Sequence, residues 1–407
     1  MPIEDILRSI ELSKEDMVRD MMGMIRIPSI GPANHGEGEG KCADYLMTLL
    51  EGFDDVKKID VKDTDYPGVM RPNILAVKKG KKKGTVWVIA HTDTVTPGDL
   101  SEWRHPPFEP FRDGDRIYGL GAEDNGQAVI ASIYASKFFK YVELNGRSLG
   151  IALVADEETT SKMGIDYLVE NEYFSKDDII LVPDWGSPGS SMIDIAEKHL
   201  LWVKVAVKGK QTHGSTPNKG LNAYRAGAKF LTELLGDLER NYSKINDLFK
   251  PSVSTFEPTK CSPTVGNVNT IPGYYEFWMD CRIIPDYDPQ EIYDHMVSFA
   301  DSFSKESGAI VTVMKEQMTV SGRPSSTETE GYRALIESIR TITGIDVQPA
   351  GIGGGTCANF FRVNGFDAYV WETEGGSLHQ PNEFVDVNSI ITDAKVYALL
   401  FQKLCVD

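Results

Sequence analysis

Short apolar runs alternate with segments of helical periodicity through the first half of the chain. Residues 73–78, 85–90, 148–154 and 178–182 each have the length and character of one buried strand. Apolar side chains recur at helical spacing in residues 14–28, 40–51 and 127–139. Continuous apolar strands separated by helices are typical of a parallel sheet that is covered on both faces. This half therefore predicts an α/β domain with a mixed, mostly parallel sheet and helices on both faces.

From about residue 196 the pattern changes to an alternation of apolar and polar positions. Residues 199–209 and 274–283 alternate in this way, as strands do when one of their faces meets water. Helical stretches at 222–239 and 289–305, and a further strand-like run at 309–314, accompany them. This content predicts a small α+β domain of the ferredoxin-like type.

After residue 320 the first pattern returns. A helix at 329–343, a glycine-rich loop at 351–356, a strand at 368–371 and a closing helix at 387–404 are expected there. We therefore predict one domain formed by residues 1–195 and 320–407, interrupted by a second domain at residues 196–319. The one basic run, residues 78–84, lies between two strand-like runs and is predicted to be a solvated hairpin turn.

Composition and charge narrow the classes of function. The chain of 407 residues is 41% hydrophobic and 25% charged, as is ordinary for a globular protein that is neither disordered nor embedded in a membrane. No apolar run is long enough to span a bilayer, and the N-terminal segment lacks the basic and apolar regions of a secretion signal. These features predict a cytoplasmic location. The net charge of −18 predicts no nucleic acid and no membrane among the partners, because such a surface repels polyanions.

Cysteine usage restricts the kind of metal site that the chain can build. The five cysteines are odd in number, widely spaced and never arranged as a CxxC pair. This pattern argues against a disulfide framework and against a zinc site made of cysteines. Any metal ligands are therefore expected among histidines and carboxylates.

Histidine and acidic residues follow the predicted strands of the first domain. Ligands of open α/β sheets gather at the carboxyl ends of the strands. His91 and Asp93 follow one apolar run, and side chains two positions apart project to the same side of a strand. A carboxylate so placed can hold one imidazole nitrogen and leave the other for a metal ion. Taken alone, the pair is more typical of a structural histidine bonded to a surface aspartate.

More carboxylates stand at the other strand ends. Glu157 and Glu158 follow residues 148–154, Asp184 follows residues 178–182, and glycine-rich loops carry Asp124 and His379. Carboxylates in series at buried strand ends are costly unless a cation neutralises them. Two imidazoles and three or more carboxylates match a two-zinc site, which cobalt or manganese would also suit. Of the adjacent pair Glu157 and Glu158, one is suited to be a ligand and the other a general base.

The ordered motifs HTDTV, GLGAEDNGQ, DEETT, VPDWGS, KGKQTHGSTP, NTIPG, GGGTCANFF and EGGSLHQPNE resemble those of one hydrolase family. It is the family of binuclear zinc exopeptidases and amidohydrolases that includes acetylornithine deacetylase, succinyl-diaminopimelate desuccinylase, aminoacylase and the bacterial glutamate carboxypeptidase. The resemblance covers roughly residues 20–400. It implies that residues 1–195 and 320–407 form the catalytic domain and that residues 196–319 form a lid and dimerisation domain.

The resemblance also implies roles for individual residues. Two zinc ions would be held by His91 and Asp184 at one ion, Glu158 and His379 at the other, and Asp124 between them. Asp93 would orient His91, and Glu157 would activate the attacking water and protonate the leaving nitrogen. His213 would stabilise the oxyanion in the neighbouring subunit of a homodimer. Substrate would be contacted by Asn269, Arg282, Gly354, Gly355 and Thr356.

The chain departs from the family pattern at a few positions. Asn125 and Gly126 follow the expected bridging aspartate where a Lys-Gly pair is common, and Cys357 stands where serine is common. Aspartate rather than glutamate at 184 resembles the peptidase members more than the deacylases.

We therefore expect a homodimeric two-zinc hydrolase that cuts the amide bond of a dipeptide or of an N-acyl amino acid with a free carboxylate. The alternatives are a monomeric two-zinc aminopeptidase of the related fold and a metal-binding homologue without catalysis. A two-metal phosphoesterase would need more basic groups near the ligands than the loops offer.

Overall fold

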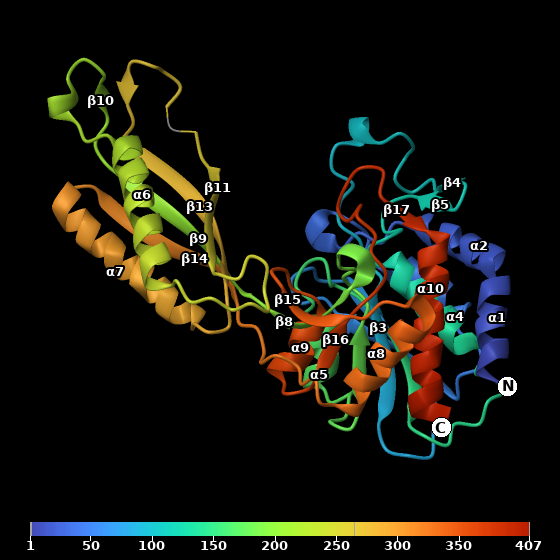
Figure 1. Ribbon diagram of the computed structural model, residues 1–407. Helices are drawn as coiled ribbons and strands as arrows, with labels where there is room; N and C mark the ends of the chain where they lie inside the picture. The colour runs from blue at the N-terminus through green and yellow to red at the C-terminus, as the bar shows by residue number, and fades with distance from the viewer. Residues whose placement is uncertain (1, 264, 407) are drawn as a thin grey trace. The chain divides into compact units, whose positions relative to one another are not determined.

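The computed structural model of the protein describes residues 2–263 and 265–406 and divides the chain into two units (Figure 1). The first unit comprises Met1–Ile195, Pro324–Ala350 and Thr356–Asp407. The second comprises Ala196–Arg323 and Gly351–Gly355. Within these described ranges, no helix is long and apolar enough to cross a membrane.

The first unit is built on an eight-stranded sheet of order β1-β2-β6-β3-β7-β16-β8-β15. Strand β3 is central, because it pairs in parallel with β6 on one side and with β7 on the other. Strands β7 and β16 are also parallel, whereas β1, β2 and β6 follow one another in antiparallel pairs. The strands are β1 Asp55–Lys62, β2 Met70–Lys78, β3 Thr85–His91, β6 Ser148–Val154, β7 Ile179–Val182, β8 Met192–Glu197, β15 Gln348–Ile352 and β16 Ala368–Val370.

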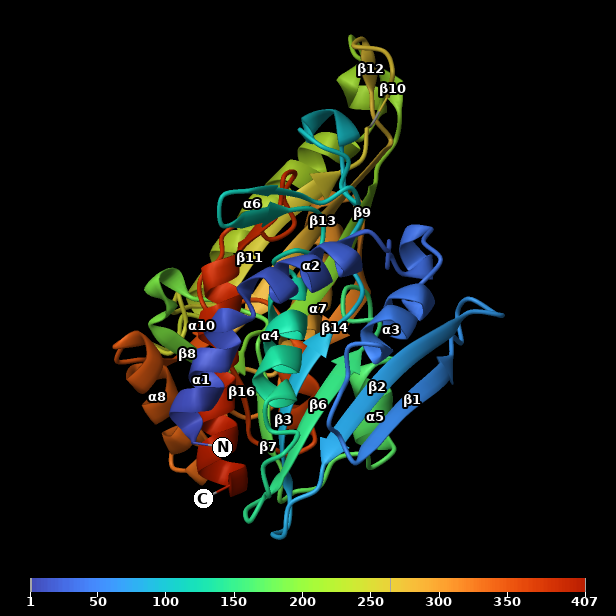
Figure 2. The ribbon, with the colours of Figure 1, turned by 90° about the vertical axis from the view of Figure 1, so that its right-hand side faces the viewer.

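Helices cover both faces of this sheet, as predicted. The helices α1, α4 and α10 lie together on one face in Figure 2. On the other face α5 and α9 pack against β3, β6 and β7 in a core that includes Trp87, Ile165 and Phe361. The helices of the unit are α1 Ile3–Leu12, α2 Lys14–Ile25, α3 Gly40–Met47, α4 Gly126–Lys137, α5 Ile165–Glu170, α8 Glu330–Thr343, α9 Cys357–Val363 and α10 Val387–Phe401. The predicted mixed, mostly parallel sheet with helices on both faces is confirmed.

One local prediction was wrong. Residues 78–84 do not form a hairpin turn, because β6 lies between β2 and β3 in the sheet. The segment instead links two strands that are not neighbours. Periodicity within a strand carries no information about which strand lies beside it, so the connection could not be settled from the two apolar runs alone.

The second unit is a four-stranded antiparallel sheet of order β11-β13-β9-β14 with two long helices (Figure 1). Its elements are β9 His199–Lys208, β11 Thr255–Cys261, β13 Tyr274–Ile283, β14 Ile310–Thr319, α6 Ala223–Asn241 and α7 Pro289–Ser307. Alternate residues of β9, such as Val203 and Val205, are buried against Phe230 of α6 and Met296 of α7. A short ribbon of β10 Thr212–His213 and β12 Thr270–Ile271 completes the unit. The alternation in the sequence thus marks the face that the helices cover.

Phe230 is expected to be a main contributor to the stability of the second unit. Its ring is buried and contacts the rings of Phe277, Phe299 and Phe303. Phe230→Ala should lower the free energy of unfolding by about 3–5 kcal/mol, because it leaves a cavity among aromatic rings. Tyr224→Ala, on the same helix but 54% exposed, is the control and should cost far less. Urea unfolding followed by circular dichroism measures both, and equal costs would contradict the assigned packing.

Candidate metal centre

Three neighbouring parallel strands of the first unit end at one edge of the sheet. Strand β3 ends at His91, which lies opposite Val154 at the end of β6. Glu157 and Glu158 follow β6, and Asp184 follows the end of β7. Because parallel strands share a direction, their carboxyl ends bring these polar groups to the same place. The polar side chains that follow these three strands in the sequence are therefore neighbours in space.

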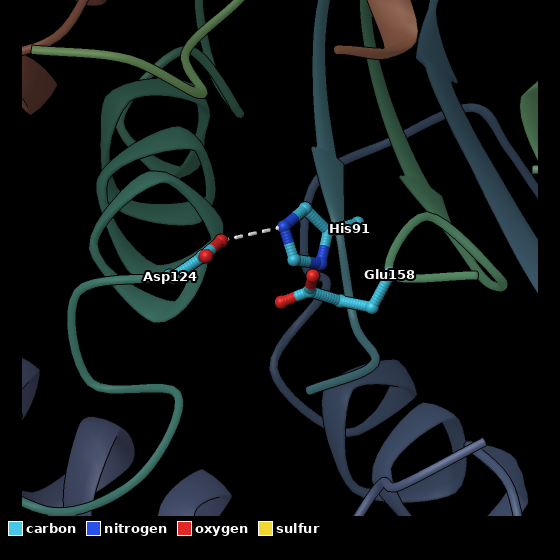
Figure 3. A group of neighbouring side chains, drawn as sticks. All are labelled: His91, Asp124 and Glu158. Carbon is cyan, nitrogen blue, oxygen red and sulfur yellow. Dashed lines mark hydrogen bonds and ion pairs between the residues drawn. The ribbon is translucent and has the colours of Figure 1, made fainter. Parts of the chain in front are cut away.

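Asp124 lies between the two histidines. Its Oδ1 is 2.8 Å from Nε2 of His91, and its Oδ2 is 3.0 Å from Nε2 of His379. Figure 3 shows Asp124 beside the start of α4, facing the imidazole at the end of β3, with Glu158 on the neighbouring loop. Each oxygen of this carboxylate thus faces a different imidazole, which is the arrangement that a carboxylate bridging two cations requires.

The remaining expected ligands divide between the two imidazoles. Asp184 Oδ1 lies 3.3 Å from Nε2 of His91, and Glu158 Oε2 lies 3.2 Å from Nε2 of His379. The structure therefore brings together all five side chains that the family resemblance implied. His91, Asp124 and Glu158 place donor atoms within 4.8 Å of one another, and so do His91, Glu157 and Asp184. Glu157, the expected base, thus lies as close to His91 as a ligand would.

Burial dominates the electrostatics of Glu157, Glu158 and Asp184, whereas at Asp124 the hydrogen bonds to His379 and His91 outweigh burial and lower the pKa. Burial raises the pKa of Glu158 to about 7, with the charge of Asp124 adding to the effect and a hydrogen bond to His379 opposing it. Burial, followed by the charge of Asp184, raises the pKa of Glu157 well above its usual range. Burial likewise raises the pKa of Asp184. Each of these upward shifts reports that negative charge at this edge lacks the solvation it would have in water.

The pKa values of His91 and His379 are raised, as expected of imidazoles surrounded by carboxylates. Hydrogen bonds to Asp124 and Glu158 raise the pKa of His379 to about 11. Burial opposes the charged form of His91, but the carboxylates of Asp184 and Asp124 outweigh it and raise its pKa. Imidazole nitrogens and carboxylate oxygens are the donors that zinc, cobalt and manganese accept. Divalent ions would replace the imidazole protons and supply the missing positive charge, so the residues present fit a metal centre.

Asp93 acts mainly on the loop that follows β6. Its two carboxylate oxygens accept the backbone N–H groups of Glu157 and Glu158 at 3.1 and 3.0 Å. Its contact with Nδ1 of His91 is closest through its main-chain carbonyl, at 3.0 Å, with the carboxylate at 3.6 Å. Asp93 therefore contacts both the histidine and the two glutamates, and its expected orientation of His91 stays a prediction.

Asn125 is a positioning residue that the sequence marked only as a departure from the family pattern. Its Nδ2 donates to Oδ1 of Asp184 at 3.0 Å and to the carbonyl of Pro183 at 2.7 Å. Its Oδ1 accepts the backbone N–H of His91 at 3.2 Å. Asn125 therefore ties the end of β3 to the segment after β7, the two places that carry His91 and Asp184.

A buried ionic cluster of Glu39, Arg71 and Asp156 was also not predicted from the sequence. Asp156 has a left-handed backbone with φ of 69° and pairs with Arg71 at 3.1 Å. Arg71 is itself fully buried and binds both carboxylate oxygens of Glu39. A carboxylate held this firmly fixes the backbone from which Glu157 and Glu158 project. In the sequence Glu39 and Arg71 look like ordinary surface charges, because nothing in the local pattern reveals that they are buried.

The expected substrate residues of the second unit form two local groups. His213 pairs with Thr270 in the β10–β12 ribbon, where the backbone N–H of Gly214 donates to the carbonyl of Asn269 at 2.7 Å. Arg282 of β13 donates to both carboxylate oxygens of Asp280, at 2.7 and 3.0 Å, and to the carbonyl of Gly353 at 2.9 Å. That last bond joins Arg282 to the loop that carries Gly354 and Gly355.

Thr356 belongs to the first unit. Its hydroxyl caps α9 by accepting the backbone N–H of Ala358 at 3.1 Å. The Thr356 hydroxyl thus serves as the N-cap of α9, and its expected contact with substrate stays a prediction.

Comparison with known proteins agrees with this geometry. The model of peptidase family M20/M25/M40 matches residues 87–403. An uncharacterized metallohydrolase of Methanocaldococcus jannaschii is 36% identical over 403 residues, which cover 94% of this chain and 98% of the relative. A succinyl-diaminopimelate desuccinylase of Acinetobacter baylyi is 25% identical over 403 residues, covering 97% and 100% of the two chains.

A solved structure has the same fold. The dipeptidase Dug1p from Saccharomyces cerevisiae superposes with a TM-score of 0.76 at 16% identity, covering 98% of each chain. The family match extends over most of the chain and includes every residue of the centre described above. The chain belongs to peptidase family M20/M25/M40 and is a metallohydrolase, as its motifs and its strand-end carboxylates predicted.

Proposed function

We propose that the protein hydrolyses the amide bond of a dipeptide or of an N-acyl amino acid that carries a free carboxylate, using two zinc ions for which cobalt or manganese can substitute. The observation that carries this proposal is the placement of Asp124, whose two oxygens face two different imidazoles. A desuccinylase among the relatives and a dipeptidase of the same fold support the substrate class.

The five expected ligands would divide between two cations. His91 and Asp184 would hold one ion, Glu158 and His379 the other, and Asp124 both. Cations held there would supply Lewis-acid chemistry, polarising the scissile carbonyl and lowering the pKa of the attacking water. The contribution of the chain is to hold these side chains in register through Asn125 and Asp93.

Glu157 is the proposed general base. It lies beside His91 and Asp184, and burial keeps the pKa of its carboxyl high. Beside bound cations that pKa would fall toward the working pH, so the carboxylate of Glu157 would take a proton from water and return it to the leaving nitrogen. The adjacent Glu158 serves as a ligand instead, because its carboxylate meets His379.

Residues of the second unit would contact substrate. Arg282 is suited to the free carboxylate, since a guanidinium already aligned by Asp280 offers a planar pair of donors. Gly354, Gly355 and Asn269 of the same unit, and Thr356 of the first unit, would contribute further donors. His213 would stabilise the oxyanion in the active site of the neighbouring subunit, which requires a homodimer formed through the second unit. The proposed location is the cytoplasm.

A second candidate is a monomeric two-zinc aminopeptidase, which shares the order of ligand types. The presence of a separate unit that carries His213 favours the dimeric hydrolase. The five ligands together with Glu157 favour catalysis over a metal-binding homologue that has lost it.

Size-exclusion chromatography with light scattering should give a dimer that is fully active. A fully active monomer would instead support the aminopeptidase.

Glu157→Gln should abolish turnover and leave metal binding intact. The amide keeps the volume of the side chain but cannot accept a proton, so the rate should fall by about 100-fold or more. Released amine from a panel of dipeptides and N-acyl amino acids measures activity, and elemental analysis measures bound metal. Glu170→Gln, an exposed change on α5, is the control. Surviving turnover in Glu157→Gln would contradict the assignment of the base, and inactivity of the metal-saturated wild type on the whole panel would contradict the proposed function.

The metal-free protein should become less stable as the pH rises, and divalent metal should remove that loss. Glu158 has a raised pKa in the folded state, so its stabilising contribution is complete below about pH 4.5 and is lost as the pH passes about 7. His379, with its pKa raised to about 11, acts in the same direction at higher pH. The increase in Tm that zinc produces should therefore grow across this interval, since metal competes with protons for the same atoms.

Calorimetry with a chelator and with added zinc measures this difference. In Glu158→Gln the pH-dependent part of the increase should shrink. An increase in Tm that is the same at every pH would show that these groups do not bind the metal.

A further inference from the structure

Two loops of the first unit supply the groups that would join the two halves of the metal centre. The first loop, residues 119–124, ends in Asp124, and the second loop, residues 375–383, contains His379. Oδ2 of Asp124 and Nε2 of His379 lie 3.0 Å apart. That spacing depends on how firmly the two loops are held against each other.

Each loop sends one buried glutamate into the other. Glu123 of the first loop accepts the backbone N–H groups of Gly376 and Ser377, both at 2.7 Å, and also the hydroxyl of Ser377. Glu383 of the second loop accepts the backbone N–H groups of Gly121, Glu123 and Asp124 at 2.9, 2.8 and 3.0 Å. The two side chains are 3% and 1% exposed. We call this reciprocal pair the glutamate clamp.

The local backbone is shaped to admit the clamp. A Cβ atom at Gly375 would lie 1.9 Å from Oε1 of Glu123, so only glycine lets the second loop approach that carboxylate. His379 has a left-handed backbone with φ of 56°, a conformation that a residue with a side chain keeps only where its surroundings impose it. Gly376 and Ser377, three and two residues before His379, donate charge-assisted hydrogen bonds to Glu123, and these bonds supply such a constraint.

We propose that Glu123 and Glu383 are positioning residues that set the distance between Asp124 and His379 and thereby the metal affinity of the half formed by Glu158 and His379. The proposal rests on the proposed function in so far as it takes these side chains as metal ligands. The other half is held differently, since His91 and Asp184 are joined through Asn125. Within the described ranges the carboxylate of Glu123 bonds to Gly376 and Ser377 of the second loop, so its loss should act on one half of the centre.

The test compares two variants of the full chain by titration of the metal-free protein with Co²⁺, followed by visible absorption. Wild type should bind two ions per chain. Glu123→Ala should lower the affinity for one ion by about 10–100-fold and leave the other unchanged. The affinity of Glu123→Gln for that ion should lie between those of wild type and Glu123→Ala, because its amide oxygen keeps one acceptor for the second loop. This graded, one-sided loss would not arise from a general weakening of the fold.

Glu374→Ala is the matched control, since it removes a carboxylate next to the second loop that accepts the N–H of Gly189 instead. It should bind both ions as wild type does. If Glu123→Ala does not fold, Ser377→Ala removes the hydroxyl bond to Glu123, together with the bonds of that hydroxyl to the main chain of Phe384, and should give a smaller loss at the same single ion. Equal loss of both ions, or no loss of either, in the folded variants would overturn the proposal. Failure of wild type to bind two ions would overturn the proposed function instead.

Discussion

The concentration of negative charge at one edge of the main sheet is the constraint on which the rest of this structure depends. Asp124, Glu157, Glu158 and Asp184 lie together where burial opposes their ionised forms. Two imidazoles are the positive partners among them. Like charges gathered out of water are tolerated only where cations neutralise them, so the arrangement that is costly in the metal-free protein favours the binding of divalent cations.

A second layer of carboxylates holds the first in place, and its partners are mostly backbone N–H groups. Asp93 binds the backbone of Glu157 and Glu158, while Glu123 and Glu383 bind the loops that carry His379 and Asp124. Hydrogen bonds from fixed backbone groups satisfy these charges without introducing competing cations. The layer therefore holds the segments that carry Asp124, Glu158 and His379 without adding positive charge to the centre itself.

Sequence patterns predicted the main architecture because they report burial directly. The apolar run that ends at His91 is a central strand with parallel neighbours on both sides, and its composition already required burial on both faces. The same runs misled at residues 78–84, where two strands consecutive in sequence are separated by β6. The residues of a strand indicate whether it is buried. Which strand pairs with it depends on packing across the whole sheet.

The sequence by itself determined which residues could form the centre, since histidine and carboxylates at the ends of apolar strands must meet at one edge of a parallel sheet. Only the tertiary structure decided which oxygen of Asp124 faces which imidazole, and that Asp93 holds two glutamates as well as His91. It also decided that Arg71, Glu39, Glu123 and Glu383 are buried supports and not surface charges. The physical reason is that a charged residue has the same local pattern in water and in the interior. Its role depends on partners that lie far away along the chain.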